Sequence, residues 1–134
     1  MVEGTDVRIG NLVWYYDYSM TETAFRVEGI LDGYIYNTLL PRSRLPFKAV
    51  HPIQLETGHL LDFSFLPEEG QHANIYAYKY HHSSSIYIRD EGYSFQPVAY
   101  SSASGFIPYG RPLAHVHQLQ NLFYDITRED IFIA

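Results

Sequence analysis

The sequence predicts an α+β domain that is mostly antiparallel β sheet or a small barrel, with one amphipathic helix near the C-terminus. The 134 residues include 13 Tyr, 8 Phe and one Trp, and aromatic side chains suit a half-buried pleated surface better than a helix interior. Several segments alternate polar and apolar residues, whereas the clearest helical periodicity is confined to residues 116–127. The length and the hydrophobic content of 46% match a single domain spanning residues 1–134.

The N-terminal part is predicted to form strands joined by tight turns. Residues 7–16 make one strand, kinked at Gly10 and Asn11 where a bulge is favoured. Residues 24–31 and 34–39 make a hairpin, because the intervening Asp-Gly pair favours a type I′ turn. One alternative within this prediction is that the N-terminal part is SH3-like.

The middle of the chain is predicted to be extended and then briefly helical. Pro52 confines the strand at residues 49–55 to a sheet edge or a short pairing, because proline cannot donate a ladder hydrogen bond. Thr57 is a candidate cap for a short helical turn over residues 58–65.

Three alternating segments follow. Residues 74–80 and 85–89 predict an antiparallel hairpin, which residues 93–100 extend. The first segment places tyrosines on one face, where they are either a stacking platform for bases or sugars or, in the interpretation that we favour, ordinary packing residues. The tyrosines on this face are Tyr76, Tyr78 and Tyr80.

The helix predicted at residues 116–127 has a continuous apolar arc and an opposite polar arc. Three residues of the apolar arc are expected to be buried against the sheet: Leu119, Leu122 and Phe123. The polar arc should point away from the core or along its rim, which avoids burying unpaired amides, and it contains His117, Asn121 and Tyr124. We expect His115 to be a capping or partly buried residue, and residues 130–134 to form a short terminal strand.

Composition argues against several classes of partner. The net charge of −6 and the pI near 5.5 oppose nucleic-acid binding, which depends on clustered Lys and Arg. The sequence has no cysteine and no apolar run long enough for a membrane helix. We therefore expect a cytoplasmic protein with no nucleic-acid or membrane partner.

No motif in the sequence indicates catalysis or a cofactor. The adjacent pair His81 and His82 would point to opposite faces of a strand, and His115 and His117 do not have the spacing of helical metal sites. The sequence also lacks a nucleophile elbow, a phosphate-binding loop and a dinucleotide fingerprint. We predict no catalytic residue, no metal and no cofactor.

Three short runs carry a resemblance to other proteins: RIGN at residues 8–11, PIQL at residues 52–55 and HQLQNLF at residues 117–123. Together they resemble a group of small uncharacterised proteins from bacterial and phage genomes, which begin with a similar RIGN strand and end on a similar HxLQNL helix. That group has no established activity, so the resemblance implies no catalytic residue. It often has Gly where Arg128 stands, so the resemblance does not fix the end of the helix.

Elimination leaves two functional hypotheses. The first is a small non-catalytic binding or adaptor module that contacts protein, either another partner or a second copy in a homo-oligomer. The alternative is a small hydrolase or sugar-binding domain that uses the outer face of the helix, namely His117, Asn121 and Tyr124. A cleft over that face would favour the alternative, whereas open solvent or a symmetric partner would favour the module.

Overall fold

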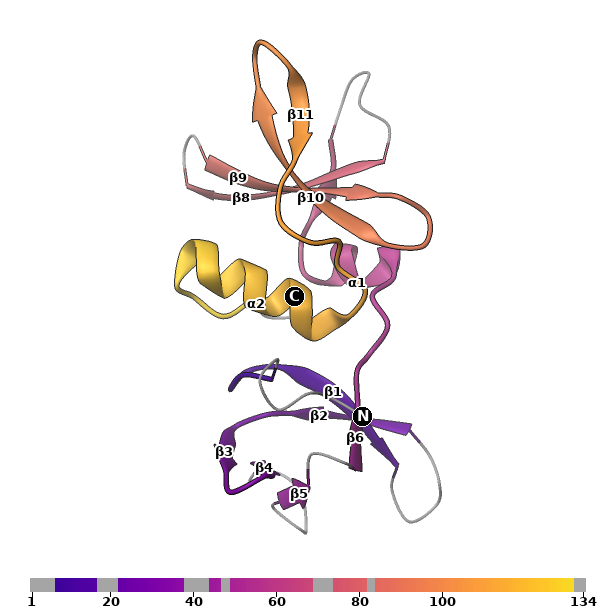
Figure 1. Ribbon diagram of the computed structural model, residues 1–134, viewed down its shortest axis with the longest axis vertical. Helices are drawn as coiled ribbons and strands as arrows, with labels where there is room; N and C mark the ends of the chain where they lie inside the picture. The colour runs from indigo at the N-terminus through magenta and orange to yellow at the C-terminus, as the bar shows by residue number, and fades with distance from the viewer. Residues whose placement is uncertain are drawn as a thin grey trace.

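The computed structural model describes residues 7–16, 22–37, 44–46, 49–68, 74–81 and 84–131. These residues form an α+β fold in which most elements are antiparallel strands, as the sequence predicts. The described strands form open sheets, and none of these sheets closes into a barrel. Helix α2 (Val116–Thr127) lies between two β layers, one from each half of the chain (Figure 1).

The N-terminal unit, residues 7–51, contains two three-stranded antiparallel sheets. Its strands are β1 (Leu12–Tyr16), β2 (Glu22–Arg26), β3 (Gly29–Leu31), β4 (Tyr34–Tyr36), β5 (Arg44–Pro46) and β6 (Val50–His51). One sheet has the order β2-β1-β6 and the other β3-β4-β5. The segment predicted as one strand at residues 24–31 is therefore divided between two sheets.

Two turns of this unit depend on a glycine with positive φ. Asp32 and Gly33 both have positive φ, 51° and 78°, which confirms the type I′ hairpin. Gly10 has a φ of 96°, and a Cβ built on it would lie 3.0 Å from Oδ1 of Asp130. Because the chain turns at Gly10, β1 begins at Leu12 and not at residue 7.

The C-terminal unit, residues 53–131, contains one five-stranded antiparallel sheet and both helices. Its elements are α1 (Thr57–Asp62), β7 (Leu66–Pro67), β8 (Ile75–His81), β9 (Ser84–Asp90), β10 (Phe95–Ser101), β11 (Gly105–Pro108) and α2. The strand order β11-β10-β9-β8-β7 confirms the predicted hairpin and its third strand. The N-cap of α1 is Glu56, so the prediction of Thr57 as the cap is wrong by one residue.

Proline marks the edges of these sheets. Pro46 lies in β5, Pro67 in β7 and Pro108 in β11, and Pro52 directly follows β6. Each of these four strands is an edge strand of its sheet. The prediction that Pro52 confines its strand to an edge is confirmed.

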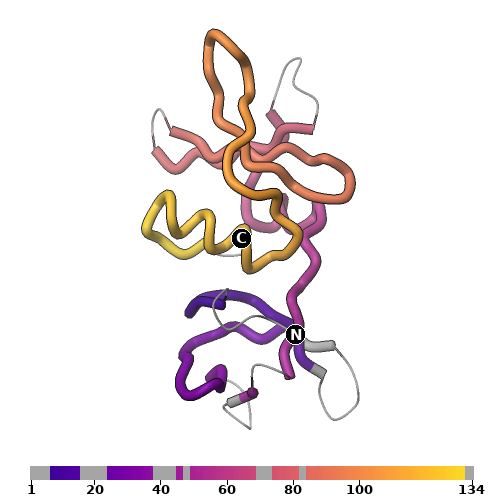
Figure 2. Tube along the Cα trace, in the orientation of Figure 1, coloured from indigo at the N-terminus to yellow at the C-terminus, as the bar shows by residue number. Residues whose placement is uncertain are grey.

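Each unit has its own apolar core. The N-terminal core consists of Val7, Val13, Phe25, Val27, Ile35 and Val50. A larger core lies between α2 and the five-stranded sheet, and its members include Leu119 and Phe123, as predicted, with Leu122 packed at its margin. The chain crosses between the two units once, along the extended segment that follows β6 (Figure 2).

Helix α2 ends at a residue in the left-handed conformation. Arg128 is the C-cap and adopts a left-handed conformation, with φ 62° and ψ 21°, a conformation that costs most residues roughly 1–2 kcal/mol and glycine almost nothing. The helix thus ends at Thr127. Asp130 and Ile131 are not in a strand, and the remainder of the predicted terminal strand lies outside the described residues.

Candidate functional site

The polar arc of α2 does not face solvent but the N-terminal unit. His117 is only 3% exposed, so of the two predicted orientations, away from the core or along its rim, the outward one is wrong. The physical reason is that periodicity distinguishes an apolar arc from a polar one, but it cannot distinguish solvent from a polar protein surface. The turn before β1 and the start of β1 contact this side of the helix through Arg8, Asn11 and Leu12.

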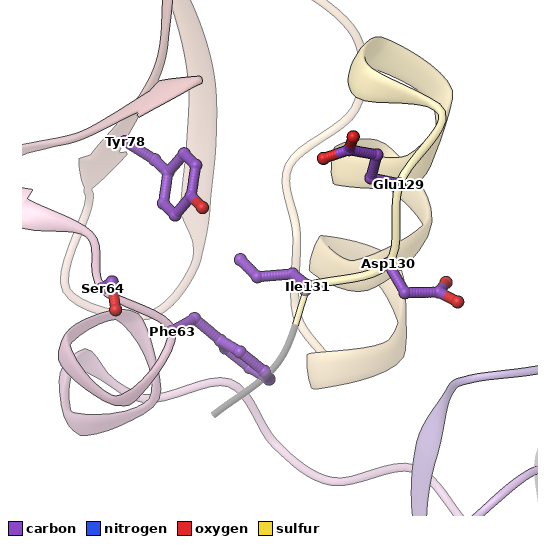
Figure 3. A pocket seen from close by; sticks show the side chains of 6 residues that line it. All are labelled: Phe63, Ser64, Tyr78, Glu129, Asp130 and Ile131. Atoms are coloured by element: carbon purple, nitrogen blue, oxygen red, sulfur yellow. The ribbon is translucent and has the colours of Figure 1, made fainter. Parts of the chain in front are cut away.

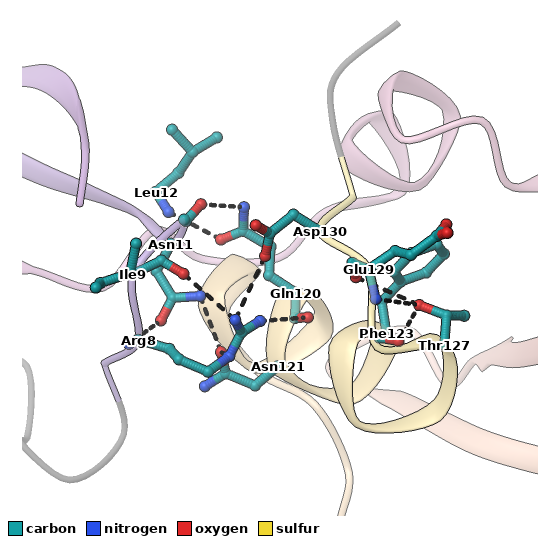
Figure 4. Close-up of polar contacts among 11 residues, drawn as sticks. Arg8, Ile9, Asn11, Leu12, Gln120, Asn121, Phe123, Thr127, Glu129 and Asp130 are labelled. Carbon is teal, nitrogen blue, oxygen red and sulfur yellow. Dashed lines mark hydrogen bonds and ion pairs between the residues drawn. The ribbon is translucent and has the colours of Figure 1, made fainter. Parts of the chain in front are cut away.

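The other two residues of the predicted polar face are also engaged within the chain. Oδ1 of Asn121 accepts hydrogen bonds from Nδ2 of Asn11 at 2.9 Å and from Nε of Arg8 at 3.1 Å (Figure 4). The guanidinium carbon of Arg8 lies 4.0 Å from the centre of the Tyr124 ring, a cation–π geometry. The N-terminal unit contacts this face at Asn121 and Tyr124.

Gln120 completes the contact between the units. Its Oε1 accepts from the backbone N–H of Leu12 at 2.8 Å, and its Nε2 donates to the carbonyl of Gly10 at 3.1 Å. The side-chain amide of Gln120, on a helix, thus pairs with the backbone just before and at the start of β1 in the way that a neighbouring strand would. The sequence does not predict Gln120, Arg8 or Asn11 as contact or binding residues.

The three short runs RIGN, PIQL and HQLQNLF meet around α2. Residues 8–11 contact residues 120 and 121 through the bonds just described. Residues 52–55 pair with the start of the helix, since Val116 donates to the carbonyl of Ile53 at 2.8 Å and Leu55 donates to that of Ala114 at 2.9 Å. The runs therefore mark the contact between the units and the anchoring of α2.

The predicted tyrosine face packs mostly inward. The Tyr78 ring lies 4.9 Å from that of Phe123 in an edge-to-face arrangement and 5.5 Å from that of Phe65. Tyr76 is likewise half-buried against the larger core. Tyr80 alone of the three is exposed. The structure therefore does not bring the tyrosines and the polar arc of α2 together.

A third face of α2 borders two adjoining hollows, which we call the α2 groove. The smaller hollow, about 300 Å³, is lined by Pro97, Tyr109, Gly110, Arg111, Pro112, Leu113, Gln118, Asn121, Leu122 and Asp125. The larger, about 550 Å³, is lined by Tyr80, Ser84, Ser85, Ile86, Tyr87, Val98, Ala99, Tyr100, Tyr109 and Ile126. Tyr109 lines both hollows and is the centre of the groove.

An unusual local structure fixes Tyr109. Pro97 lies in β10, an interior strand, and cannot donate to the ladder. The buried side chain of Gln96 replaces the missing donor, because its Nε2 donates to the carbonyls of Tyr109 and Pro97, each at 3.0 Å. The backbone N–H of Tyr109 in turn donates to the Pro97 carbonyl at 3.0 Å.

The groove is aromatic, and the hydroxyl of Tyr109 at its centre stays protonated at neutral pH. Burial raises the pKa of Tyr109, and the nearby Tyr80 raises it further. Beside the groove, the Phe106 ring lies 5.1 Å from that of Tyr87 and 5.3 Å from that of Tyr100. The groove can therefore offer flat apolar surfaces and the neutral hydroxyl of Tyr109.

A further hollow of about 550 Å³ lies beyond the C-terminal end of α2 (Figure 3). It is lined by Phe63, Ser64, Tyr78, Glu129, Asp130 and Ile131. The Asp130 carboxylate is turned away from this hollow, and its Oδ1 lies 3.4 Å from a terminal nitrogen of Arg8. Within the described residues, no three His, Cys, Asp or Glu side chains are grouped to hold a metal ion.

His115 caps α2, as the sequence predicts. The imidazole of His115 accepts a hydrogen bond from the backbone N–H of Gln118. The backbone N–H of His115 donates to Oε1 of Gln118 at 3.0 Å. Burial lowers the pKa of His115 from its ordinary value of 6.5. A protonated imidazole has no acceptor, so the cap requires the neutral form.

We expect His115 to make stability depend on pH. Because its pKa is lower in the folded state, its contribution is complete above about pH 6.5 and falls as the pH decreases below that value. His115→Asn retains a good N-cap residue but cannot titrate. Denaturant unfolding at about pH 7.5 and about pH 5.5 should show a smaller loss of stability for the variant than for the wild type, and equal losses would contradict the prediction.

Two features stand out among the described residues: the polar contact between the two units, and the exposed aromatic α2 groove. In the described part of the chain no helix is long and apolar enough to cross a membrane. No protein-family model, curated protein or solved structure matches the chain.

Proposed function

We propose that this protein is a non-catalytic binding module that contacts a protein partner through the α2 groove. The observation that carries the proposal is the gathering of exposed aromatic and apolar side chains at the groove and on the adjoining β10–β11 hairpin. Tyr100 is 58% exposed and Tyr109 37%, and Tyr80 and Ile107 are exposed beside them. Tyrosine is enriched at protein interfaces because it offers a large contact area with little loss of conformational entropy.

The partner would be recognised by side chains and not by strand addition. Since Tyr109 donates to Pro97 across the β10–β11 ladder, alternation directs the backbone groups of Phe106 and Pro108 outward. Pro108 has no N–H to offer to an added strand. This favours docking into the groove over extension of the sheet.

The alternative of a hydrolase or a sugar-binding domain depends on the polar arc of α2. In the structure that arc contacts the N-terminal unit, and Asn121 already accepts two hydrogen bonds there. The groove borders the neighbouring side of the helix and meets this arc only at Asn121. The geometry therefore favours the protein-binding proposal.

The experiment is a selection of displayed random peptides on the immobilised protein, run beside a glycan array. Selected peptides should lose about tenfold or more of their affinity for the double variant Tyr100→Ser/Tyr109→Ser, because truncated aromatic anchors commonly cost about 2 kcal/mol. Tyr93→Ser is the matched control, since Tyr93 is 90% exposed and does not line the groove.

Two results would contradict the proposal. One is glycan binding in the absence of any selected peptide, which would support the sugar-binding alternative. The other is peptide binding that the double variant and the control affect equally. Light scattering over a range of concentrations separately tests whether the partner is a second copy.

A further inference from the structure

The contact between the two units is partly polar, whereas the core of each unit is apolar. The two apolar cores have no member in common, and a single crossing of the chain joins the units. Their contact contains Leu12 and Trp14, packed against the larger core, beside the polar network of Arg8, Asn11 and Gln120. Units with separate cores and partly polar interfaces commonly move relative to one another.

Arg8 is the centre of this contact (Figure 4). Its guanidinium donates to the carbonyl of Gln120 at 3.2 Å and to Oδ1 of Asn121 at 3.1 Å, pairs with Asp130 at 3.4 Å and lies over Tyr124. All these partners belong to α2 or to the chain just after it. The side chains of Arg8 and Asp130 are 29% and 39% exposed, so dissolved ions can reach the pair.

We propose that the N-terminal unit is a hinged cover over the polar arc of α2, fastened by Arg8. When the contacts of Arg8 are broken, the unit moves away from α2 as a body while both cores stay folded. The hinge is the single crossing after β6. Opening exposes His117, Asn121 and Tyr124, the residues that the sequence predicts as a binding face, so the cover controls access to a surface that meets the α2 groove only at Asn121.

The single tryptophan of the chain reports this motion. Trp14 lies on β1 and packs against the core of the other unit, so opening exposes its indole to water. Acrylamide quenching of Trp14 fluorescence therefore measures the open fraction, and far-UV circular dichroism shows whether the strands and helices persist.

The variant is Arg8→Ala in the full chain. Loss of several charge-assisted hydrogen bonds should raise the open fraction on the order of tenfold, with higher Trp14 quenching and unchanged circular dichroism. The matched control is Arg89→Ala, which removes an ion pair of similar exposure, 3.2 Å from Glu91, within the C-terminal unit. The control should leave Trp14 quenching as in the wild type.

Wild-type protein supplies a second measurement that does not depend on the folding of a variant. Raising NaCl from about 0.1 M to about 1 M shortens the Debye length from about 10 Å to about 3 Å, which should increase Trp14 quenching without loss of circular dichroism. Salt-independent quenching would overturn the proposal. So would equal effects of the two Arg variants, or exposure of Trp14 only together with global unfolding.

Discussion

Replacing Phe123 with Ala is expected to lower the free energy of unfolding by about 3 to 5 kcal/mol. Phe123 is 3% exposed, belongs to the larger core and packs edge-to-face against Tyr78. The substitution removes this ring contact and leaves a cavity between α2 and β8. Urea denaturation followed by circular dichroism measures the loss, which is a large fraction of the roughly 5 to 15 kcal/mol of a typical domain.

Asn121→Ala is the comparison on the same helix. The sequence alone predicts a far smaller loss than for Phe123, on the view that Asn121 faces outward. The structure raises that expectation to about 1 to 3 kcal/mol, because the variant leaves buried Asn11 without the acceptor of its Nδ2. A loss at Asn121 equal to or greater than that at Phe123 would show that the polar contact, and not the apolar arc, determines the orientation of α2.

Gln96→Leu is expected to lower the free energy of unfolding by about 1 to 3 kcal/mol despite its apolar character. The buried amide of Gln96 donates to the carbonyl of Tyr109, in place of the N–H that Pro97 lacks. Leucine has a similar volume but no donor, so the carbonyl loses its partner. Peptides selected for the α2 groove should also bind the variant more weakly, because Tyr109 is no longer fixed.

Gln54→Leu is the matched control for this substitution. Gln54 is exposed, and its replacement should change stability by no more than about 0.5 kcal/mol. If the Gln96 variant is as stable as this control, the amide does not complete the ladder.

Local chemistry explains the elements that the sequence predicts well. The limits of α2 at Val116 and Thr127 agree with the structure because its apolar arc is continuous. The Asp32–Gly33 turn depends only on two residues that accept positive φ. The β8–β9 hairpin follows from alternation on both sides of a short loop.

What the sequence does not predict depends on contacts between distant segments. The two-residue strand β7 and the four-residue strand β11 contain proline, so neither has the alternation of a longer strand. The hydrogen bonds of Asn121 require knowledge that the N-terminal unit packs on α2, about a hundred residues away in sequence.

The residues of the candidate site divide in the same way, into those that local sequence predicts and those that depend on distant contacts. The alternation of its own strand places Tyr80 on the predicted tyrosine face, and Tyr80 lines the groove. Tyr109 is isolated between Pro108 and Gly110 in the sequence, so no periodicity singles it out. Its position is determined by Gln96 and Pro97 on the neighbouring strand, and a pairing of strands cannot be inferred from residue type alone.

The prolines at the sheet edges have a consequence for the protein at high concentration. A chain rich in tyrosine and β structure offers open ladders on which other copies can assemble into fibrils. Pro46, Pro52, Pro67 and Pro108 remove a backbone donor at or beside four such ladders. The fold therefore resists edge-to-edge aggregation through its backbone, and it can display exposed aromatic side chains at a lower risk of forming amyloid.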